Sequence, residues 1–309
     1  MADLPHSIRH VAIWGLGAVG TMLAARILPR LAPGETFRVI ADADRIARYR
    51  RTPPTFNGAP LSLDYANPAA TPPPAPADLI LLAVKTDALP ATCDALPPFI
   101  APHTLLLPLL NGLDAADRLA ADFGDAHVLR GLVFCNSAAR TGRAVVQHGA
   151  LNVQLGAFHA ANASTASLFA DWLRAHGIPA EVPPDMTSAL WRKFLLNVGL
   201  NQAEAATGLS HGALLASPDA MSLLHTLIDE AAAVAVAEGV PDVPRLVREA
   251  LDALDLLTPE GKTSMLQDVE ASRHPEIETF AGTVVTLAAP HHIPVPANTA
   301  LLSRFRRAP

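Results

Sequence analysis

Lysine and asparagine recur every four residues within one apolar stretch, "WRKFLLNVGLNQAEAATG", which spans residues 191–208. The apolar density predicts a helix, and because four residues turn a helix by about 400°, Lys193, Asn197 and Asn201 share one face of it. An ammonium can stabilise a negatively charged oxygen and protonate it, while amides can hold the polar groups of a substrate. Each asparagine costs about half a kcal/mol relative to alanine inside a helix. The stripe therefore predicts a polar face directed into a cleft between domains, with a solvent-exposed face as the alternative.

A second group of polar residues follows in "GKTSMLQDVEASRHPEIETF", residues 261–280. Ser264, Gln267 and Asp268 precede Glu276 in this segment, and all four side chains can form hydrogen bonds. The alternative to a binding role is a surface loop or helix start, with Glu276 in a first turn where the helix dipole favours a carboxylate.

The residues that would hold a cofactor lie near the N-terminus. "HVAIWGLGAVGTMLAARIL" runs from an apolar strand through Gly15, Gly17 and Gly20 into a helix, which is the order found in dinucleotide-binding folds. The first glycine permits a tight turn, the second lets a pyrophosphate approach the backbone, and the third lets the helix pack close to the strand. The N–H groups at the helix N-terminus would then face the phosphates. A glycine-rich turn in another kind of α/β protein is the alternative.

The end of the second predicted strand bears on the choice of cofactor. "FRVIAD" ends at Asp42, which is 22 residues after Gly20. An acidic residue at about this distance binds the adenosine ribose and favours NAD. Arg45 and Arg48 follow at once, and either could turn toward the 2′-phosphate of NADP or lie on a solvated helix face. These residues leave NAD and NADP open.

Two further buried-type strands end in polar residues. "ADLILLAVKTDAL" (77–89) leads to Lys85, and "TLLLPLLNGLDAADRL" (104–119) leads to Asn111 and Gly112. Ligands bind outside the carboxyl ends of strands in open parallel sheets, so Lys85 and Asn111 are expected to face the cofactor. An ordinary surface lysine and a turn dipeptide are the alternatives. "HVLRGLVFCNSAARTGRAVVQHG" predicts two more strands, joined by a turn, that continue the sheet.

The pattern changes to helical periodicity from about Asp185, just after the two consecutive prolines of "AEVPPD" (180–185). We therefore expect an α/β Rossmann-type dinucleotide-binding domain over residues 1–183 and an all-α domain for substrate binding and dimerisation over residues 184–309. The segment "LIDEAAAVAVAEG" could bury one face against a partner in a homodimer or against its own domain, and periodicity does not distinguish the two.

Composition limits the class of protein. The chain has 309 residues, half of them hydrophobic, which is enough for two domains with substantial cores. A formal net charge of −6 argues against nucleic acid or an anionic membrane as the main partner. The two cysteines, Cys93 and Cys135, form no CxxC pair, which favours a reducing, cytoplasmic location. Apolar runs such as "LILLAV" are too short to span a bilayer, and no histidine or cysteine cluster predicts a metal site.

In combination, these motifs resemble the ketopantoate reductases (2-dehydropantoate 2-reductases) along nearly the whole chain. The resemblance rests on "GLGAVG" (15–20), Lys85 in "AVKT", "LLNG" (109–112), "WRKFLLNVGLN" (191–201), "TSMLQD" (263–268) and "PEIE" (275–278). The Lys-x3-Asn-x3-Asn helix and the spacing from Ser264 to Glu276 are specific in combination. The glycine motif alone indicates only a dinucleotide.

The resemblance implies a role for each matched residue. Lys193 matches the general acid, and Glu276 matches a glutamate near the nicotinamide ribose and the active site, so both are candidate catalytic residues. The candidate substrate-binding residues are Asn111, Lys193, Asn197, Asn201 and Ser264. The candidate cofactor-binding residues are Gly15, Leu16, Gly17, Ala18, Val19, Gly20, Asp42, Arg45, Lys85, Asn111, Ala138 (through its backbone) and Glu276.

The reaction that the resemblance implies is NAD(P)H-dependent reduction of ketopantoate to pantoate, in pantothenate and coenzyme A biosynthesis. Hydride would reach the C2 carbonyl carbon while Lys193 protonates the oxygen. The resemblance implies NADPH, but many family members carry an arginine where this chain has Asp42, so NADH is also considered.

The sequence leaves three alternative functions open. One is a reductase of another 2-keto acid in the same family, and another is a non-catalytic NAD(P)-binding redox sensor. The third is a 2-hydroxyacid or opine-type dehydrogenase, which would normally rely on a histidine; His211, His291 and His292 lie in no matched constellation.

Overall fold

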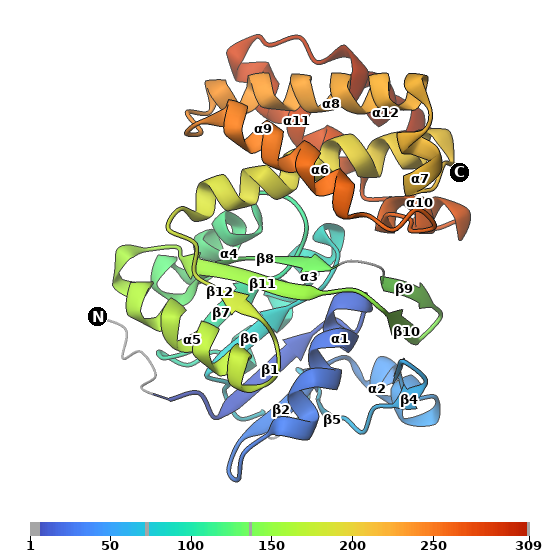
Figure 1. Cartoon of the computed structure of the whole chain (residues 1–309). Coiled ribbons are helices and arrows are strands. Elements are labelled where there is room, and N and C mark those ends of the chain that lie inside the picture. The colour runs from blue at the N-terminus through green and yellow to red at the C-terminus, as the bar shows by residue number, and fades with distance from the viewer. Residues whose placement is uncertain (1–6, 72–73, 136–137, 308–309) are drawn as a thin grey trace. The chain divides into compact units, whose positions relative to one another are not determined.

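The protein consists of two compact units (Figure 1). The computed structural model describes residues 7–71, 74–135 and 138–307. The first unit is Met1–Leu110 with Asp114–Met186, and the second unit is Asn111–Leu113 with Thr187–Pro309. The sequence analysis puts the change of domain between residues 183 and 184, and it does not predict that Asn111–Leu113 belongs with the helical unit.

A five-stranded parallel sheet forms the centre of the first unit. The strand order is β5–β2–β1–β6–β7, so the chain winds outward in both directions from β1, as in a Rossmann fold. The strands are β1 His10–Trp14, β2 Thr36–Ile40, β5 Asp64–Ala66, β6 Leu79–Leu82 and β7 Leu105–Pro108. β1 pairs with both β2 and β6, and Val11 lies opposite Phe37 on one side and Leu79 on the other. The predicted Rossmann-type fold is confirmed.

Helices cover both faces of this sheet, because alternate strand residues point to opposite sides. Ile13 and Leu81 pack with α1 (Ala18–Ile27) and α5 (Ala163–Ala175) on one face. Ile80 and Leu82 pack with α3 (Leu89–Ala95) and α4 (Ala115–Phe123) on the other. A strand buried on both faces is apolar throughout rather than alternating, which explains the continuous run in β6.

The expectation that the next two strands continue this sheet is wrong for the segment after residue 137. The hairpin of β9 (Ala138–Thr141) and β10 (Ala144–Gln147) belongs to a separate sheet of order β4–β3–β10–β9, with β3 Thr55–Phe56 and β4 Ala59–Pro60. In β10, buried and exposed residues alternate, which suits a sheet covered on one face rather than on two.

A third sheet lies next to the parallel one. β8 (Leu129–Cys135) begins directly after a bridge between Val128 and Leu106 of β7. It pairs antiparallel with β11 (Leu151–Ala157), which in turn pairs with β12 (Ala180–Glu181). β8 therefore belongs to a separate sheet, and the expectation that it continues the parallel sheet is also wrong.

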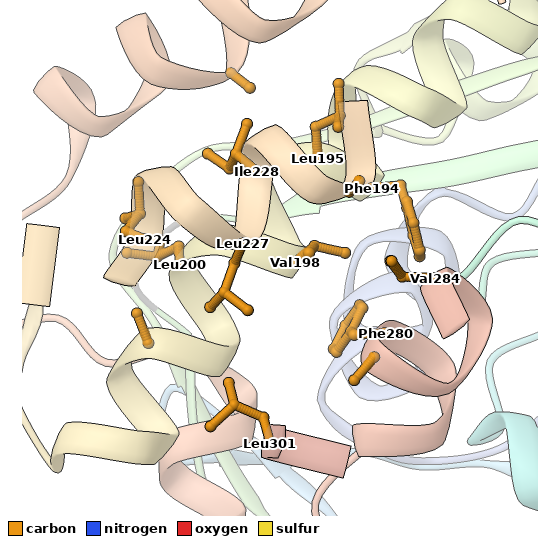
Figure 2. Close-up of a cluster of buried hydrophobic side chains, with 14 of the residues drawn as sticks. Phe194, Leu195, Val198, Leu200, Leu224, Leu227, Ile228, Phe280, Val284 and Leu301 are labelled. Atoms are coloured by element: carbon orange, nitrogen blue, oxygen red, sulfur yellow. The ribbon is translucent and has the colours of Figure 1, made fainter. Parts of the chain in front are cut away.

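The second unit is helical, as predicted. Its helices are α6 (Met186–Thr207, whose first residue belongs to the first unit), α7 (His211–Leu215), α8 (Pro218–Ala237), α9 (Val243–Asp252), α10 (Ser264–Glu270), α11 (Thr283–Ala288) and α12 (Pro296–Arg306). Figure 2 shows its core, in which Phe194 and Val198 of α6 lie among side chains from α8, α11 and α12. A Cβ at Gly199 would lie 2.6 Å from Cγ1 of Ile228, so this glycine lets α6 and α8 approach closely.

Among the described residues, one helix, α8, is long and apolar enough to cross a membrane by length and composition. Its side chains Leu224, Leu227, Ile228 and Val234 are buried in the core of the second unit, as in the core helix of a folded domain. The segment "LIDEAAAVAVAEG" thus buries its apolar face within its own unit, with Val236 63% exposed. It gives no support to a homodimer, which stays a prediction.

A buried polar network joins α5 to the turn before β2. Glu35 accepts hydrogen bonds from the indole of Trp172 (3.2 Å), the N–H of Ala32 (2.7 Å) and Nε2 of His176 (3.0 Å). Nδ1 of His176 also donates to the carbonyl oxygen of Trp172 (2.8 Å). Burial alone would raise the pKa of Glu35, but the three hydrogen bonds outweigh it and lower that pKa below its ordinary value.

We predict that Glu35→Gln lowers the free energy of unfolding by about 1–3 kcal/mol at pH 7, because an amide cannot accept all three bonds. Since the pKa of Glu35 is lowered by folding, its stabilisation is present above the unfolded value of about 4.3 and is lost as pH falls through the folded value. The difference in free energy of unfolding between wild type and Glu35→Gln should therefore become smaller below about pH 4.3. Urea unfolding at several pH values measures it.

The matched control is Asp171→Asn on α5, the helix that carries Trp172, and the Asp171 carboxylate forms an exposed pair with Arg174. Exposed pairs contribute about 0–1 kcal/mol, so this variant should stay close to wild type. Equal losses of unfolding free energy in Glu35→Gln and Asp171→Asn would contradict the stabilising role of the Glu35 hydrogen bonds.

Candidate functional site

Two glycines, Gly15 in the turn after β1 and Gly20 in the first turn of α1, are required by packing. Gly15 has φ +104°, and an added Cβ would lie 2.4 Å from the carbonyl oxygen of Ala83, just beyond β6. A Cβ at Gly20 would lie 1.8 Å from the carbonyl oxygen of Gly15. Neither position accepts a side chain without moving the backbone. The turn therefore lies tightly between β1, β6 and α1, where the strand order reverses and α/β proteins bind their ligands.

Gly17 is different, because nothing lies within 4 Å of the Cβ it lacks. It is the N-cap of α1 with φ −76°, and the first turn of that helix carries no acidic residue. No packing contact explains a glycine here. The open space beside the N–H groups of a helix start fits the close approach of a pyrophosphate.

The other residues of the motif turn their side chains toward the core. Leu16 is buried in the core of the first unit, and Ala18 and Val19 pack partly against the same core. Binding of a phosphate by their N–H groups stays a prediction.

Asp42 lies just beyond β2, which ends at Ile40 rather than at Asp42 as predicted. It is the N-cap of α2 (Ala43–Arg51), and its Oδ1 accepts from the N–H of Arg45 at 2.7 Å. The guanidinium of Arg45 lies 3.4 Å from the other carboxylate oxygen, and both side chains are at least half exposed. The arginine considered for a 2′-phosphate is therefore paired with the carboxylate considered for the ribose.

Lys85 and Ala138 lie in different parts of the first unit. Lys85 is exposed and follows β6 by three residues, ahead of the short turn Thr86–Ala88. Ala138 is half-buried and begins β9, where it pairs with Gln147. Their contacts with a cofactor stay predictions.

In the second unit, Asn111 connects Lys193 to Glu276. Nζ of Lys193 donates to Oδ1 of Asn111 at 3.0 Å, and Nδ2 of Asn111 donates to Oε2 of Glu276 at 3.0 Å. All three side chains are half-buried. Because a carboxylate accepts only from the NH₂ side of the amide, the amide oxygen must face the ammonium. Residues predicted from three separate motifs thus form one hydrogen-bonded chain.

The other candidate substrate-binding residues, on α6 and α10, have unused hydrogen-bonding groups. Within the described part of the chain, no hydrogen bond is formed by the side chains of Asn197, Asn201 or Ser264. Asn201 is 6% exposed as a residue, but its amide is not one of the fully buried polar groups that lack a partner. These side chains are therefore available for a ligand.

Glu276 is followed by a π-helical turn, Glu278–Gly282, rather than lying in the first turn of a regular helix. Arg306 of α12 binds Glu278 through Nε (2.5 Å) and Nη2 (2.8 Å), and this hydrogen bonding lowers the pKa of Glu278. π-turns are rare and often occur at functional sites. The sequence analysis missed Arg306 and the turn, and no local pattern signals either.

Glu204 was not identified from the sequence, and His211 was set aside because it lies in no matched constellation. Glu204 is fully buried on α6, and one of its oxygens pairs with Nδ1 of His211. The signal for Glu204 was its position three residues after Asn201, on the same polar face. Among residues 7–71, 74–135 and 138–307, no three histidine, cysteine or acidic side chains form a group suited to a metal ion.

Comparison with known proteins shows the family to which the chain belongs. Residues 11–160 match the family model "Ketopantoate reductase PanE/ApbA", and residues 185–308 match "Ketopantoate reductase PanE/ApbA C terminal". A curated 2-dehydropantoate 2-reductase of Halobacterium salinarum is 32% identical over 242 residues, which are 76% of this chain and 77% of the relative.

Two solved structures share the fold. A PanE/ApbA family ketopantoate reductase from Ralstonia eutropha is 27% identical with a TM-score of 0.77, covering 96% of this chain and 97% of that one. A D-mandelate dehydrogenase with NADH and anilino(oxo)acetate is 21% identical with a TM-score of 0.87 over the same shares of the two chains.

Alanine should have different effects at Gly17, which lies beside open space, and at Gly20, which lies against the backbone of Gly15. Gly17→Ala should leave the melting temperature unchanged but weaken binding of a reduced nicotinamide dinucleotide by about tenfold or more, since the Cβ occupies the space of the pyrophosphate. Gly20→Ala, the control, should lower the melting temperature because the Cβ meets the backbone of Gly15. Fluorescence titration and thermal unfolding measure the two. A Gly17→Ala protein that binds cofactor like wild type would contradict the role of this glycine.

Proposed function

Since the chain belongs to the ketopantoate reductase family and is an NAD(P)-dependent oxidoreductase, we propose that it reduces ketopantoate (2-dehydropantoate) to pantoate. One observation carries the proposal. The ammonium of Lys193 is held by Asn111 and Glu276, on a helix face that also offers the unpaired amides of Asn197 and Asn201. A cation beside unused hydrogen-bonding groups suits a small, anionic molecule whose oxygen gains negative charge.

Lys193 is the general acid in this proposal. When bound, the reduced nicotinamide supplies a hydride to the C2 carbonyl carbon of the substrate. As the carbonyl oxygen gains negative charge, the ammonium of Lys193 stabilises it more strongly than it stabilises the uncharged ketone, which lowers the barrier. A proton of Nζ then passes to that oxygen and forms the hydroxyl group of the product, leaving a neutral amine.

Asn111 and Glu276 are proposed to hold Lys193 in place. Glu276 fixes the orientation of the Asn111 amide, so that the amide oxygen and not the NH₂ group faces Lys193. A flipped amide would direct two N–H groups at the ammonium. This reasoning favours an action of Glu276 on Lys193, through Asn111, over a contact with the cofactor ribose.

Asn197, Asn201 and Ser264 are proposed to bind the carboxylate and hydroxyl groups of the substrate. Holding these groups fixes the carbonyl relative to Lys193, and such alignment accounts for a large part of enzymatic rate enhancement. Reduction of another 2-keto acid would use the same residues. A redox sensor that only binds NAD(P) would need none of them.

In the first unit, Gly15, Gly17 and Gly20 with the backbone of Leu16, Ala18 and Val19 are proposed to hold the pyrophosphate. Family resemblance implies NADPH, but Asp42 supports NADH instead. Its carboxylate is fixed by the α2 backbone, suits a ribose hydroxyl, and repels a 2′-phosphate. Arg45 is paired with Asp42 and thus already partly neutralised. We therefore propose that NADH is the preferred cofactor.

We further propose a cytoplasmic location in pantothenate and coenzyme A biosynthesis, with a small 2-keto acid and no nucleic acid or membrane as partner. Both cysteines are free thiols, which suits a reducing compartment. A homodimer through the second unit is also proposed, and light scattering of the purified protein tests it.

Lys193→Ala should reduce kcat for ketopantoate at least about a hundredfold, the lower end for a general acid, with little change in cofactor affinity. The control is Lys262→Ala, which also removes an ammonium from the second unit, but from an exposed pair with Glu270. It should retain wild-type kcat. The oxidation of NADH or NADPH, followed by absorbance, measures both. A loss of less than about tenfold in Lys193→Ala would remove this residue from the role.

The same assay with a panel of 2-keto acids separates the alternatives. Highest kcat/KM for ketopantoate supports the proposal, and highest kcat/KM for another 2-keto acid identifies a different reductase of the family. Cofactor binding without turnover of any 2-keto acid would indicate a sensor.

Asp42→Asn should raise kcat/KM with NADPH relative to NADH by about tenfold or more, because it removes the charge that repels the 2′-phosphate. Asparagine caps helices as well as aspartate does, so α2 should stay intact. Asp44→Asn, with the same charge change in the first turn of the same helix, should leave the ratio unchanged. If the wild type already prefers NADPH, Asp42 does not select the cofactor.

A further inference from the structure

The polar face of α6 continues past Asn201 to Glu204. Glu204 lies eleven residues after Lys193, and at about 100° per residue it returns to within about 20° of the direction of Lys193. It is fully buried, and the reaction proposed above assigns it no part. A buried carboxylate is strongly unfavourable unless it is paired and hydrogen-bonded, so its partners indicate why it is there.

Those partners come from two other segments of the second unit. One oxygen of Glu204 pairs with Nδ1 of His211, at the start of α7, and the other accepts from the N–H of Thr263 at 2.8 Å. His211 is 8% exposed. The buried carboxylate thus joins α6 to the start of α7 and to the residue before α10.

The loop before α10 also lies directly against His211. The N–H of His211 donates to the carbonyl oxygen of Gly261 (3.0 Å), and the N–H of Gly212 donates to that of Pro259 (2.9 Å). A Cβ at Gly261 would lie 2.4 Å from Cδ2 of the imidazole. This contact leaves no room for a side chain, so the ring and the loop form one packed layer over Glu204.

Thr263 determines where α10 begins. It is the N-cap of this helix, and its Oγ1 accepts from the N–H of Leu266 at 3.3 Å. Its carbonyl oxygen accepts the first helical bond, from the N–H of Gln267 at 3.0 Å. Its own N–H is the group held by Glu204. The next residue is Ser264, exposed in the first turn.

We propose that Glu204 is a positioning residue for substrate binding. By holding the N-cap of α10, it fixes Ser264 relative to Asn197 and Asn201, which lie on the same helix as Glu204. His211 supplies the second hydrogen bond that keeps the carboxylate in place. This inference rests on the proposed contact of Ser264 with the substrate.

The test compares two substitutions of Glu204. Glu204→Ala removes both hydrogen bonds and should raise the KM for the 2-keto acid about tenfold, with kcat changed less than about threefold and cofactor KM unchanged. Glu204→Gln can accept from Thr263 and donate to a neutral His211 whose proton is on Nε2. It should therefore rescue the KM to within about threefold of wild type.

The matched control is Glu230→Ala. Glu230 holds the start of α12 in the same way, accepting from the N–H groups of Ala297 (2.8 Å) and Asn298 (3.0 Å), but α12 carries no residue proposed to contact the substrate. Both alanine variants should lose stability, and only Glu204→Ala should raise the KM. Equal effects on KM would reduce Glu204 to a structural residue and overturn the proposal.

A double mutant tests whether Glu204 acts through Ser264. In a Ser264→Ala background, Glu204→Ala should raise the KM no further, because the positioned group is gone. Fully additive effects would overturn the proposal. If Ser264→Ala itself leaves the KM unchanged, both the positioning role and the proposed contact of Ser264 are wrong, while the role of Lys193 is judged by its own variant.

Thr263→Ala serves if Glu204→Ala does not fold. It keeps the N–H that Glu204 binds but removes the cap to Leu266, which costs about 1 kcal/mol. The KM for the 2-keto acid should rise about fivefold, without addition to Ser264→Ala. A folded Thr263→Ala protein with wild-type KM would overturn the proposal.

Discussion

The hydrogen bond from Lys193 to Asn111 joins residues 82 positions apart in the chain. It holds a half-buried ammonium at one point on α6, and an amide accepts from that ammonium without neutralising it. A carboxylate in direct contact would hold the lysine more strongly but would also compete with a negatively charged oxygen of a substrate. The structure places the carboxylate one step away, behind Asn111. The ammonium is therefore held by an amide that leaves its positive charge in place.

α6 combines this polar face with a role in the core. Phe194, Leu195 and Val198 are buried among side chains of α8, α11 and α12 (Figure 2), and this packing fixes the rotation of the helix about its axis. Once that rotation is fixed, the spacing of four residues places Lys193, Asn197 and Asn201 on the remaining face. Hydrophobic packing of α6 therefore determines the direction in which its polar side chains point.

Sequence patterns predicted those features of the protein that arise from interactions between residues close together in the chain. The glycine turn and the polar stripe follow from backbone sterics and helical repeat, so both could be found in the sequence. The hairpin at β9 and β10 was misassigned because local alternation does not say which sheet a strand joins. The link of Asn111 to Lys193 and Glu276 is a long-range contact with no local signal. Asp42 was recognised, but its capping of α2 and its pairing with Arg45 depend on where β2 ends. Glu204 was overlooked although it continues the stripe.

The short segment Asn111–Leu113 belongs with the helical unit, although the chain on both sides of it belongs with the first unit. The backbone therefore passes between the units three times, before residue 111, after residue 113 and after residue 186. A fragment cut at the obvious boundary would begin near residue 187 and would contain Lys193 and Glu276 without the amide that connects them. The helical unit therefore cannot be exchanged between relatives as one contiguous segment. Such an exchange would combine the ammonium of one protein with the asparagine loop of another.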